Sequence, residues 1–278
     1  MRSQFRARGW DHGDPGVHGD DGDLPMIRSS DQTSRGAPIG TDERSASAAV
    51  RQMFTDIAPR YDLLNHLLSL NIDRLWWRRT ARTFAHILRR DSTRALDLCC
   101  GTGDMALALA KVRGSAKAEI IGADFSHAML VRAEGKSAGT DLRWVEANAL
   151  RLPLPNASFD LVVLAFGFRN LANYDAGLRE IARVLRPGGE VGILDFSQPG
   201  GAWGKLYAFY FRHVLPRIGT LISGVRGPYE YLPASVERFP APEEMLERMR
   251  TMGFCGVSWT PYTFGIAGLF RGRKVSSF

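Results

Sequence analysis

The chain has 278 residues, which is enough for one large domain or two small ones, and 45% of them are hydrophobic. Its 3 cysteines lack the paired spacing of a zinc site, and no apolar run approaches the roughly 18 residues that cross a bilayer. These features argue against a metal module and an integral membrane protein. We expect a cytoplasmic chain that at most touches the inner face of a membrane. The formal net charge of +7 suits nucleic acid, an anionic membrane or simply a solvated basic surface.

The first 45 residues differ in composition from the rest. Residues 9–22 are rich in Gly, Asp and His, and residues 29–47 are rich in Ser, Thr and Arg. Because apolar side chains are too sparse there to offset the entropy of ordering, we expect residues 1–45 to be a disordered tail. Residues 46–278 are then expected to form a single domain. Met26 is a candidate for an alternative translation start.

The hydrophobic spacing after Ser47 indicates an N-terminal helical extension, with a second helix at roughly residues 72–88. Strands and helices then alternate, which predicts a doubly wound, mostly parallel α/β sheet with helices on both faces. An aromatic segment at residues 203–218 interrupts this alternation, and residues 203–233 are expected to form an inserted helical lid. The expected strands are 95–99, 120–124, 142–146, 159–166, 190–196, 257–262 and 265–271, and the later helices are 104–111, 128–134, 174–185 and 242–252.

The most informative stretch is a strand that ends in Gly101-Thr-Gly103, directly before a helical pattern. A glycine turn between a strand and a helix is where nucleotide-like cofactors bind in doubly wound sheets. A turn that binds a diphosphate needs bare N–H groups and no nearby anion. Here Asp97 lies in the strand and Asp104 opens the helix. The turn therefore favours a cofactor with cationic groups, S-adenosylmethionine, over NAD.

Sheet geometry predicts further cofactor contacts at the carboxyl ends of the other strands. Asp124 ends the second strand at the spacing expected for a ribose-binding acid, although it can also serve as a helix cap. Asn148, after the third strand, is placed to meet an adenine, or is an ordinary turn residue. The fourth strand leads into Arg169-Asn170, whose loop should face the glycine turn.

Four sequence blocks resemble the C-methyltransferases that act on membrane quinones. They occur in the family's order across roughly residues 50–272, and the first, third and fourth are the more particular ones. The blocks are Phe54-x-x-Ile57-Ala-x-x-Tyr61-Asp62-x-x-Asn65, Leu96-Asp97-x-x-x-Gly101-Thr-Gly-Asp104, Phe166-Gly-x-Arg169-Asn170 and His213-Val-Leu-Pro-Arg-Ile-Gly219.

The resemblance implies a Rossmann-like class I methyltransferase with a seven-stranded sheet that uses S-adenosylmethionine. Its substrate would be a prenylated quinol, either demethylmenaquinol or the ubiquinone precursor 2-methoxy-6-polyprenyl-1,4-benzoquinol. The family often has a serine at the position of Ala165 and a glutamate at that of Asp195. The expected cofactor-binding residues are Asp97, Gly101, Thr102, Gly103, Asp124, Asn148, Ala149 and Ala165.

Methylation of a quinol ring carbon requires stabilisation of a phenolic oxyanion and an acceptor for its proton. Arg169, together with Asn170, suits the first task because a guanidinium stays charged and offers several donors. Tyr61, Asp62 and His213 are candidates for the second, and each can equally be a structural residue. The sequence does not rank these three.

Two other classes of protein stay open at this stage. A basic methyltransferase fold can modify RNA, but the chain has no aromatic and basic RNA-binding module. A non-catalytic quinone-binding protein is the other alternative, which the intact cofactor residues disfavour. The aromatic residues of 203–211 are expected to wall an apolar substrate entry or to lie on a membrane surface. The oligomeric state, including a homo-oligomer, and the length of the isoprenoid tail stay open.

Overall fold

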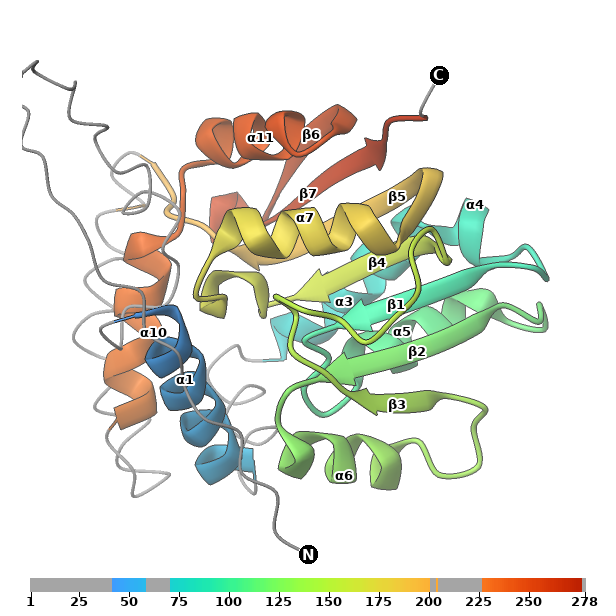
Figure 1. Ribbon diagram of the computed structural model, residues 1–278, viewed down its shortest axis with the longest axis horizontal. Coiled ribbons are helices and arrows are strands. Elements are labelled where there is room, and N and C mark those ends of the chain that lie inside the picture. Colours follow the sequence, from blue (N-terminus) through green and yellow to red (C-terminus); the bar gives the residue numbers. More distant parts are fainter. Residues whose placement is uncertain (1–41, 59–70, 201–203, 205–226, 277–278) are drawn as a thin grey trace, which may run out of the picture. The chain divides into compact units, whose positions relative to one another are not determined.

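The sheet has seven strands in the order β3-β2-β1-β4-β5-β7-β6 (Figure 1). This computed structural model describes residues 42–58, 71–200, 204 and 227–276. Strands β1 to β5 pair in parallel, and β7 lies antiparallel between β5 and β6. The expected doubly wound, mostly parallel sheet is therefore confirmed. The strands are β1 (Arg94–Leu98), β2 (Glu119–Asp124), β3 (Arg143–Glu146), β4 (Phe159–Ala165), β5 (Leu185–Phe196), β6 (Phe254–Tyr262) and β7 (Ala267–Lys274).

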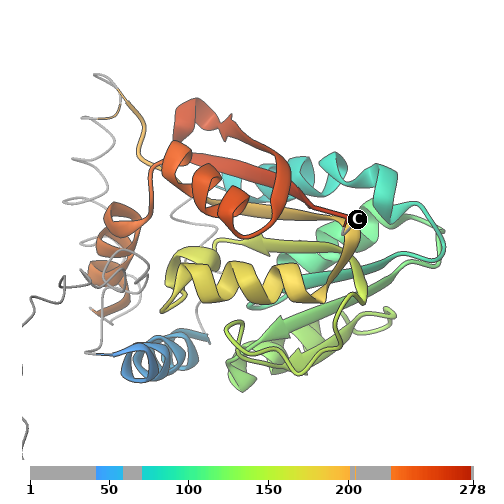
Figure 2. The ribbon, with the colours of Figure 1, turned by 45° about the horizontal axis from the view of Figure 1, so that its top comes forward.

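Helices cover both faces of this sheet, with α7 and α11 in front and α3 and α4 behind in Figure 2. In the described ranges, none of them is both long and apolar enough to cross a membrane. The helices are α1 (Glu43–Ile57), α3 (Ile72–Thr83), α4 (Ala85–Leu88), α5 (Asp104–Arg113), α6 (His127–Lys136), α7 (Tyr174–Val184), α10 (Gly227–Arg238) and α11 (Pro242–Thr251).

Alternation along the strands divides the core into two layers. Leu96 and Leu98 of β1 pack with the residues of α7 and α11. Ala95 points to the other face, where it joins α3, α4 and α5. Asp97 follows the same two-residue period as Ala95, so a carboxylate lies at an otherwise apolar position. Such a residue is costly for the fold and is therefore a candidate for function.

Helix α1 begins earlier than the expected boundary at residue 46. Asp42 and Ser45 form a capping box at its start, in which Ser45 N donates to Asp42 Oδ1 at 2.8 Å. Ala46 and Val50 are buried in a small cluster with Tyr231 of α10. The two helices contact each other, and Figure 1 shows them side by side. Residues 42–45 therefore belong to α1 and its N-terminal cap, four residues before the expected start of the domain.

Two helix boundaries also differ from those expected. The helix expected at residues 72–88 breaks at Phe84 into α3 and α4, because the Phe84 ring packs over the backbone of Gly192. The helix expected to reach residue 185 ends at Val184, and β5 already begins at Leu185. A register shift between β4 and β5 accommodates Pro187-Gly188-Gly189 inside the strand. Within the expected lid, the structure describes α10, and residues 205–226 lie outside the described part.

Candidate active site

The glycine turn after β1 has the strand–turn–helix form that its sequence predicts. Gly101 and Gly103 both adopt positive φ, at 53° and 85°, and Gly103 N donates to Cys100 O at 2.9 Å. A Cβ on Gly103 would lie 2.5 Å from the Trp144 ring, so no larger residue fits there. The turn thus places backbone N–H groups at the start of α5.

Asp97 lies completely buried beneath this turn. Neither of its carboxylate oxygens has a hydrogen-bond partner in the described part of the chain. Burial raises the pKa of Asp97 well above its usual value, and the nearby carboxylates of Asp124 and Asp104 raise it further. A ligand that brings a cation close to the turn would stabilise this carboxylate, whereas a diphosphate would destabilise it.

Asp104 contributes less negative potential at the glycine turn than its sequence position suggests. Lys136 of α6 donates to Asp104 Oδ1 at 2.8 Å and to Thr102 Oγ1 at 3.0 Å. The negative charge of Asp104 is therefore balanced within the protein. The preference for a cationic ligand depends chiefly on Asp97 and Asp124.

Asp124 ends β2 with its carboxylate facing the glycine turn. Its Oδ2 accepts from Gly101 N at 2.9 Å, and its Oδ1 accepts from Ser126 N at 2.9 Å. Burial raises its pKa to about 6, and the two backbone donors oppose that shift. The carboxylate therefore organises both loops, and it also lines a pocket in which the lone pairs left on its oxygens can accept hydroxyl donors.

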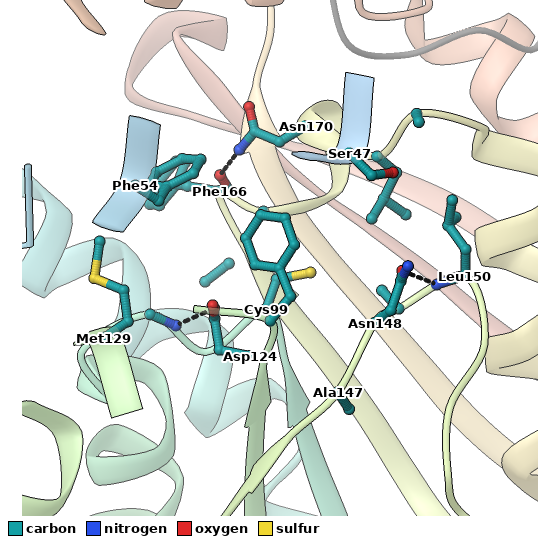
Figure 3. A pocket seen from close by; sticks show the side chains of 17 residues that line it. Ser47, Phe54, Cys99, Asp124, Met129, Ala147, Asn148, Leu150, Phe166 and Asn170 are labelled. Atoms are coloured by element: carbon teal, nitrogen blue, oxygen red, sulfur yellow. Dashed lines mark hydrogen bonds between the residues drawn. The ribbon is translucent and has the colours of Figure 1, made fainter. Parts of the chain in front are cut away.

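The pocket opens at the carboxyl ends of β1, β2 and β4 and has a volume of about 650 Å³, which includes its open mouth (Figure 3). Six of the expected site residues line it, whereas Asp97, Thr102 and Gly103 lie beside it. The lining residues are Ser47, Phe54, Cys99, Gly101, Asp124, Phe125, Met129, Ala147, Asn148, Ala149, Leu150, Ala165, Phe166, Gly167, Asn170, Leu171 and Ala172.

Several of these residues were not anticipated from the sequence as site residues. Ser47 and Phe54 come from α1, which is far from the glycine turn in sequence and contacts α6. Phe125 and Met129 follow β2, directly after the expected ribose-binding acid. Phe54 is part of the first quoted sequence block, and that is the one signal that could have indicated it.

The loops after β1 and β4 meet at the topological switch point with almost no space between them. A Cβ on Gly167 would lie 2.4 Å from the Cβ of Cys99. Cys99 and Phe166 both have positive φ, at 57° and 60°, which is uncommon for residues with side chains. Strain of this kind costs about 1–3 kcal/mol per residue and concentrates at functional sites. The fold maintains this backbone strain beside the pocket.

Phe166 is held in this conformation by a set of hydrogen bonds. Its N–H donates to Leu194 O at 2.7 Å, and its carbonyl accepts from Arg169 Nη1 and from Asn170 Nδ2. Its ring lines the pocket and packs on Phe196 and Trp76, with centroid distances of 4.6 and 5.8 Å. Phe166 therefore provides an aromatic wall whose position depends on the next few residues of its loop.

Arg169 forms a buried ion pair and is not one of the lining residues. Its Nη1 donates to Asp195 Oδ1 at 2.8 Å, its backbone N donates to Asp195 Oδ2 at 3.0 Å, and the two side chains are 8% and 0% exposed. The guanidinium also lies over the Phe196 ring, 5.2 Å from its centroid. This arrangement ties the loop after β4 to the end of β5.

Asn170 connects the same loop to α10. Its Oδ1 accepts from the Tyr231 hydroxyl at 3.0 Å, and burial raises the pKa of Tyr231 to about 12. Asn170 also lines the pocket. The remaining expected catalytic residues, Tyr61, Asp62 and His213, lie outside the described residues, as do residues 205–218 of the aromatic segment.

This sheet order, with an acidic second strand end and a pocket at the switch point, defines a class I S-adenosylmethionine-dependent methyltransferase. The ubiE/COQ5 methyltransferase family matches residues 41–274, and the chain belongs to this family. S-adenosylmethionine is therefore its cofactor, in agreement with the buried Asp97 carboxylate and with the place of Asp124 in the pocket lining.

Comparison with other known proteins agrees with this assignment. The chain is 49% identical over 240 residues to the demethylmenaquinone methyltransferase of Deinococcus radiodurans, covering 85% of this chain and 97% of that protein. It is 50% identical over 225 residues to the enzyme of the same name from Thermus thermophilus, covering 80% and 100%. A Thermotoga maritima S-adenosylmethionine-dependent methyltransferase, described as a possible histamine N-methyltransferase, shares the fold at 20% identity and a TM-score of 0.53, over 81% and 99%.

Proposed function

We propose that this methyltransferase converts demethylmenaquinol to menaquinol by methylation of a ring carbon. The observation that supports this substrate most is the near-complete match to two demethylmenaquinone methyltransferases at 49% and 50% identity. The pocket is compatible with it. Phe54, Phe166 and Leu171 supply apolar walls, which suit an aromatic ring that carries an isoprenoid tail.

The pocket residues bind and orient the cofactor in this proposal. Asp124, Asn148 and Ala149 line the pocket, so Asp124 would accept from the ribose hydroxyls, and Asn148 and Ala149 would contact the adenine. Asp97 supplies negative potential beneath the glycine turn, to which Gly101, Thr102 and Gly103 contribute backbone groups. The bound cofactor supplies an electrophilic methyl group, so the chain's own task is to align it with an electron-rich ring carbon.

A ring carbon of the quinol must become electron-rich enough to act as the nucleophile. Loss of a hydroxyl proton gives an oxyanion that pushes charge onto the adjacent ring carbon, which then forms the new C–C bond as the S–CH₃ bond breaks. The methylated ring carbon would then lose its own proton, which restores the aromatic ring as a phenolate, and that oxygen would take a proton back to give the quinol. One proton in total would be released, together with S-adenosylhomocysteine. We propose that one of Tyr61, Asp62 and His213 accepts the hydroxyl proton.

We propose that Arg169 acts mainly by positioning the loop that carries Phe166 and Asn170. Its guanidinium is buried, and Nη1 donates both to Asp195 and to the Phe166 carbonyl, so one edge of the guanidinium is committed to holding the loop. Arg169 is also not among the residues that line the pocket, and a movement of its guanidinium toward the substrate that broke its pair with Asp195 would leave a buried carboxylate without its cation. The side chain of Asn170 is nearer to the substrate because it lines the pocket itself.

The proposed substrate is tested by lipid extraction from cells that lack the protein. Accumulation of demethylmenaquinone, reversed by the intact gene, supports the proposal. Accumulation of a demethylated ubiquinone precursor would instead identify the second substrate, since a relative at 42% identity is named a ubiquinone/menaquinone biosynthesis C-methyltransferase. Unchanged quinones in the deletion strain would refute both substrates.

A further inference from the structure

Helix α3 presents a stripe of arginines to solvent. Arg74, Arg78 and Arg82 recur every four residues and are exposed, and Leu75, between them, is 58% exposed. Across the part of the chain that the structure describes, none of these three arginines has an ion-pair partner, and their four-residue spacing gathers them on one face of the helix. The stripe is therefore a concentration of uncompensated positive charge.

A second exposed apolar side chain lies on the turn between β6 and β7, which is hydrogen-bonded to α3. Phe264 is 84% exposed and adopts a positive φ of 55°. The neighbouring Thr263 Oγ1 accepts from Trp76 Nε1 of α3 at 2.8 Å, which fixes the turn against the helix. Arg74, Leu75, Arg78, Arg82 and Phe264 together form what we call the α3 surface.

The α3 surface adjoins the wall of the active-site pocket. Trp76 packs on the Phe166 ring at a centroid distance of 5.8 Å, and Phe166 lines the pocket. On its other side Trp76 is tied to the β6–β7 turn, as described above. One buried side chain therefore separates the pocket wall from an exposed surface that is both basic and apolar.

We propose that the α3 surface docks the enzyme on a bilayer that contains anionic phospholipids. Three unpaired arginines are complementary to lipid phosphates, and transfer of Leu75 and Phe264 into the interface removes apolar area from water. An RNA partner has no use for an exposed aliphatic residue such as Leu75, so the observations favour a membrane. The choice of a bilayer also rests on the proposed function, because a prenylated quinol is dissolved in one.

The test measures binding of the full-length protein to vesicles of phosphatidylcholine, with and without phosphatidylglycerol. The variant Arg74→Gln/Arg78→Gln/Arg82→Gln should bind the anionic vesicles about 100-fold more weakly, since each basic residue near such a surface contributes about fivefold. The matched control is Lys117→Gln/Arg132→Gln/Arg179→Gln, which removes the same charge from exposed positions elsewhere. It should bind nearly as well as the unmodified protein.

A second variant, Leu75→Gln/Phe264→Asn, isolates the apolar part of the surface. Asn tolerates the positive φ at position 264, so the turn should keep its form. We expect this variant to bind vesicles more weakly than the unmodified protein. The difference between the two should persist at high salt, where the contribution of the arginines is screened. Equal binding by the arginine variant and its control would overturn the proposal. It would also be overturned if the arginine variant lost affinity for single-stranded RNA while retaining its affinity for vesicles.

A turnover measurement separates this proposal from the proposed substrate. With a water-soluble short-tailed quinol, the arginine variant should turn over as fast as the unmodified protein. With quinol embedded in anionic vesicles, its rate should fall in parallel with its binding. Absence of turnover in the unmodified protein would refute the substrate and leave the vesicle-binding result standing. A normal rate on vesicles in the arginine variant would refute the docking surface alone.

Discussion

Arg169→Ala removes the cation of the buried pair with Asp195, and it should lower stability strongly. Breaking a buried ion pair by removing one partner costs about 3–5 kcal/mol, because the other charge stays buried without compensation. Asp195 is 0% exposed, so water does not relieve that cost in the folded state. In a domain of this size the loss corresponds to a decrease in melting temperature of about 6–20 °C.

The same substitution should also affect the site. Loss of the Arg169 donor to the Phe166 carbonyl leaves Asn170 as its remaining side-chain donor, so the strained loop should relax and the aromatic wall should shift. We therefore expect cofactor affinity and turnover to fall together with stability. Thermal unfolding by circular dichroism, calorimetric titration with S-adenosylmethionine and single-turnover kinetics on one preparation measure all three.

Arg250→Ala is the matched control for this experiment, because Arg250 pairs with Glu247 at the surface with side chains 51% and 64% exposed. It should cost less than about 1 kcal/mol. The double variant Arg169→Ala/Asp195→Asn should lose less stability than the sum of its single variants. A normal melting temperature in Arg169→Ala with a single-turnover rate reduced about 10²–10³-fold would refute the positioning role and indicate direct oxyanion contact.

Three further predictions concern the cofactor pocket and the domain boundary. Asp124→Asn should weaken S-adenosylmethionine binding by about 1.5–3 kcal/mol in calorimetry. In the unmodified protein the affinity for S-adenosylmethionine should fall about tenfold per pH unit below about pH 6, since protonation of Asp124 removes the ionised acceptor. The variant should lose this pH dependence. Equal pH profiles in the two proteins would rule out Asp124 as the titrating group. Gly167→Ala should impair folding and cofactor binding, because the added Cβ would lie 2.4 Å from that of Cys99. The control Gly135→Ala should be tolerated, because a Cβ added there has no atom within 4 Å. Equal melting temperatures of the two variants would contradict the close packing at Gly167. A chain that starts at residue 46 should unfold at a lower temperature than one that starts at residue 42, because it loses about 1 kcal/mol of helix capping. Identical melting curves would show that Asp42 does not stabilise α1.

Local sequence signals predicted the central part of the fold and of the site. The glycine turn, the alternation of strands and helices and the spacing to Asp124 are short-range patterns, and each reflects a backbone requirement that operates within a few residues. Gly103 is an example, because positive φ and the Trp144 ring both exclude a side chain there.

Features that depend on contacts distant in sequence were not predictable in the same way. Residues 72–88 have a continuous helical pattern, and only the packing of Phe84 over Gly192 breaks it. Arg169 is expected at the substrate because a guanidinium stays charged and offers several donors. Its pairing with Asp195 is not visible in any local pattern, because the two residues are 26 positions apart in sequence. The contribution of α1 to the pocket likewise follows from tertiary packing against α6.

The most direct test of the proposed reaction uses S-adenosylmethionine labelled in its methyl group. The unmodified protein is incubated separately with demethylmenaquinol, with the ubiquinone precursor and with RNA, and the products are analysed by mass spectrometry. The proposal predicts that the label appears on a ring carbon of menaquinol and that the Asp124→Asn variant transfers it much more slowly. Label found in RNA or on a quinol oxygen, or no transfer to any quinol, would contradict it.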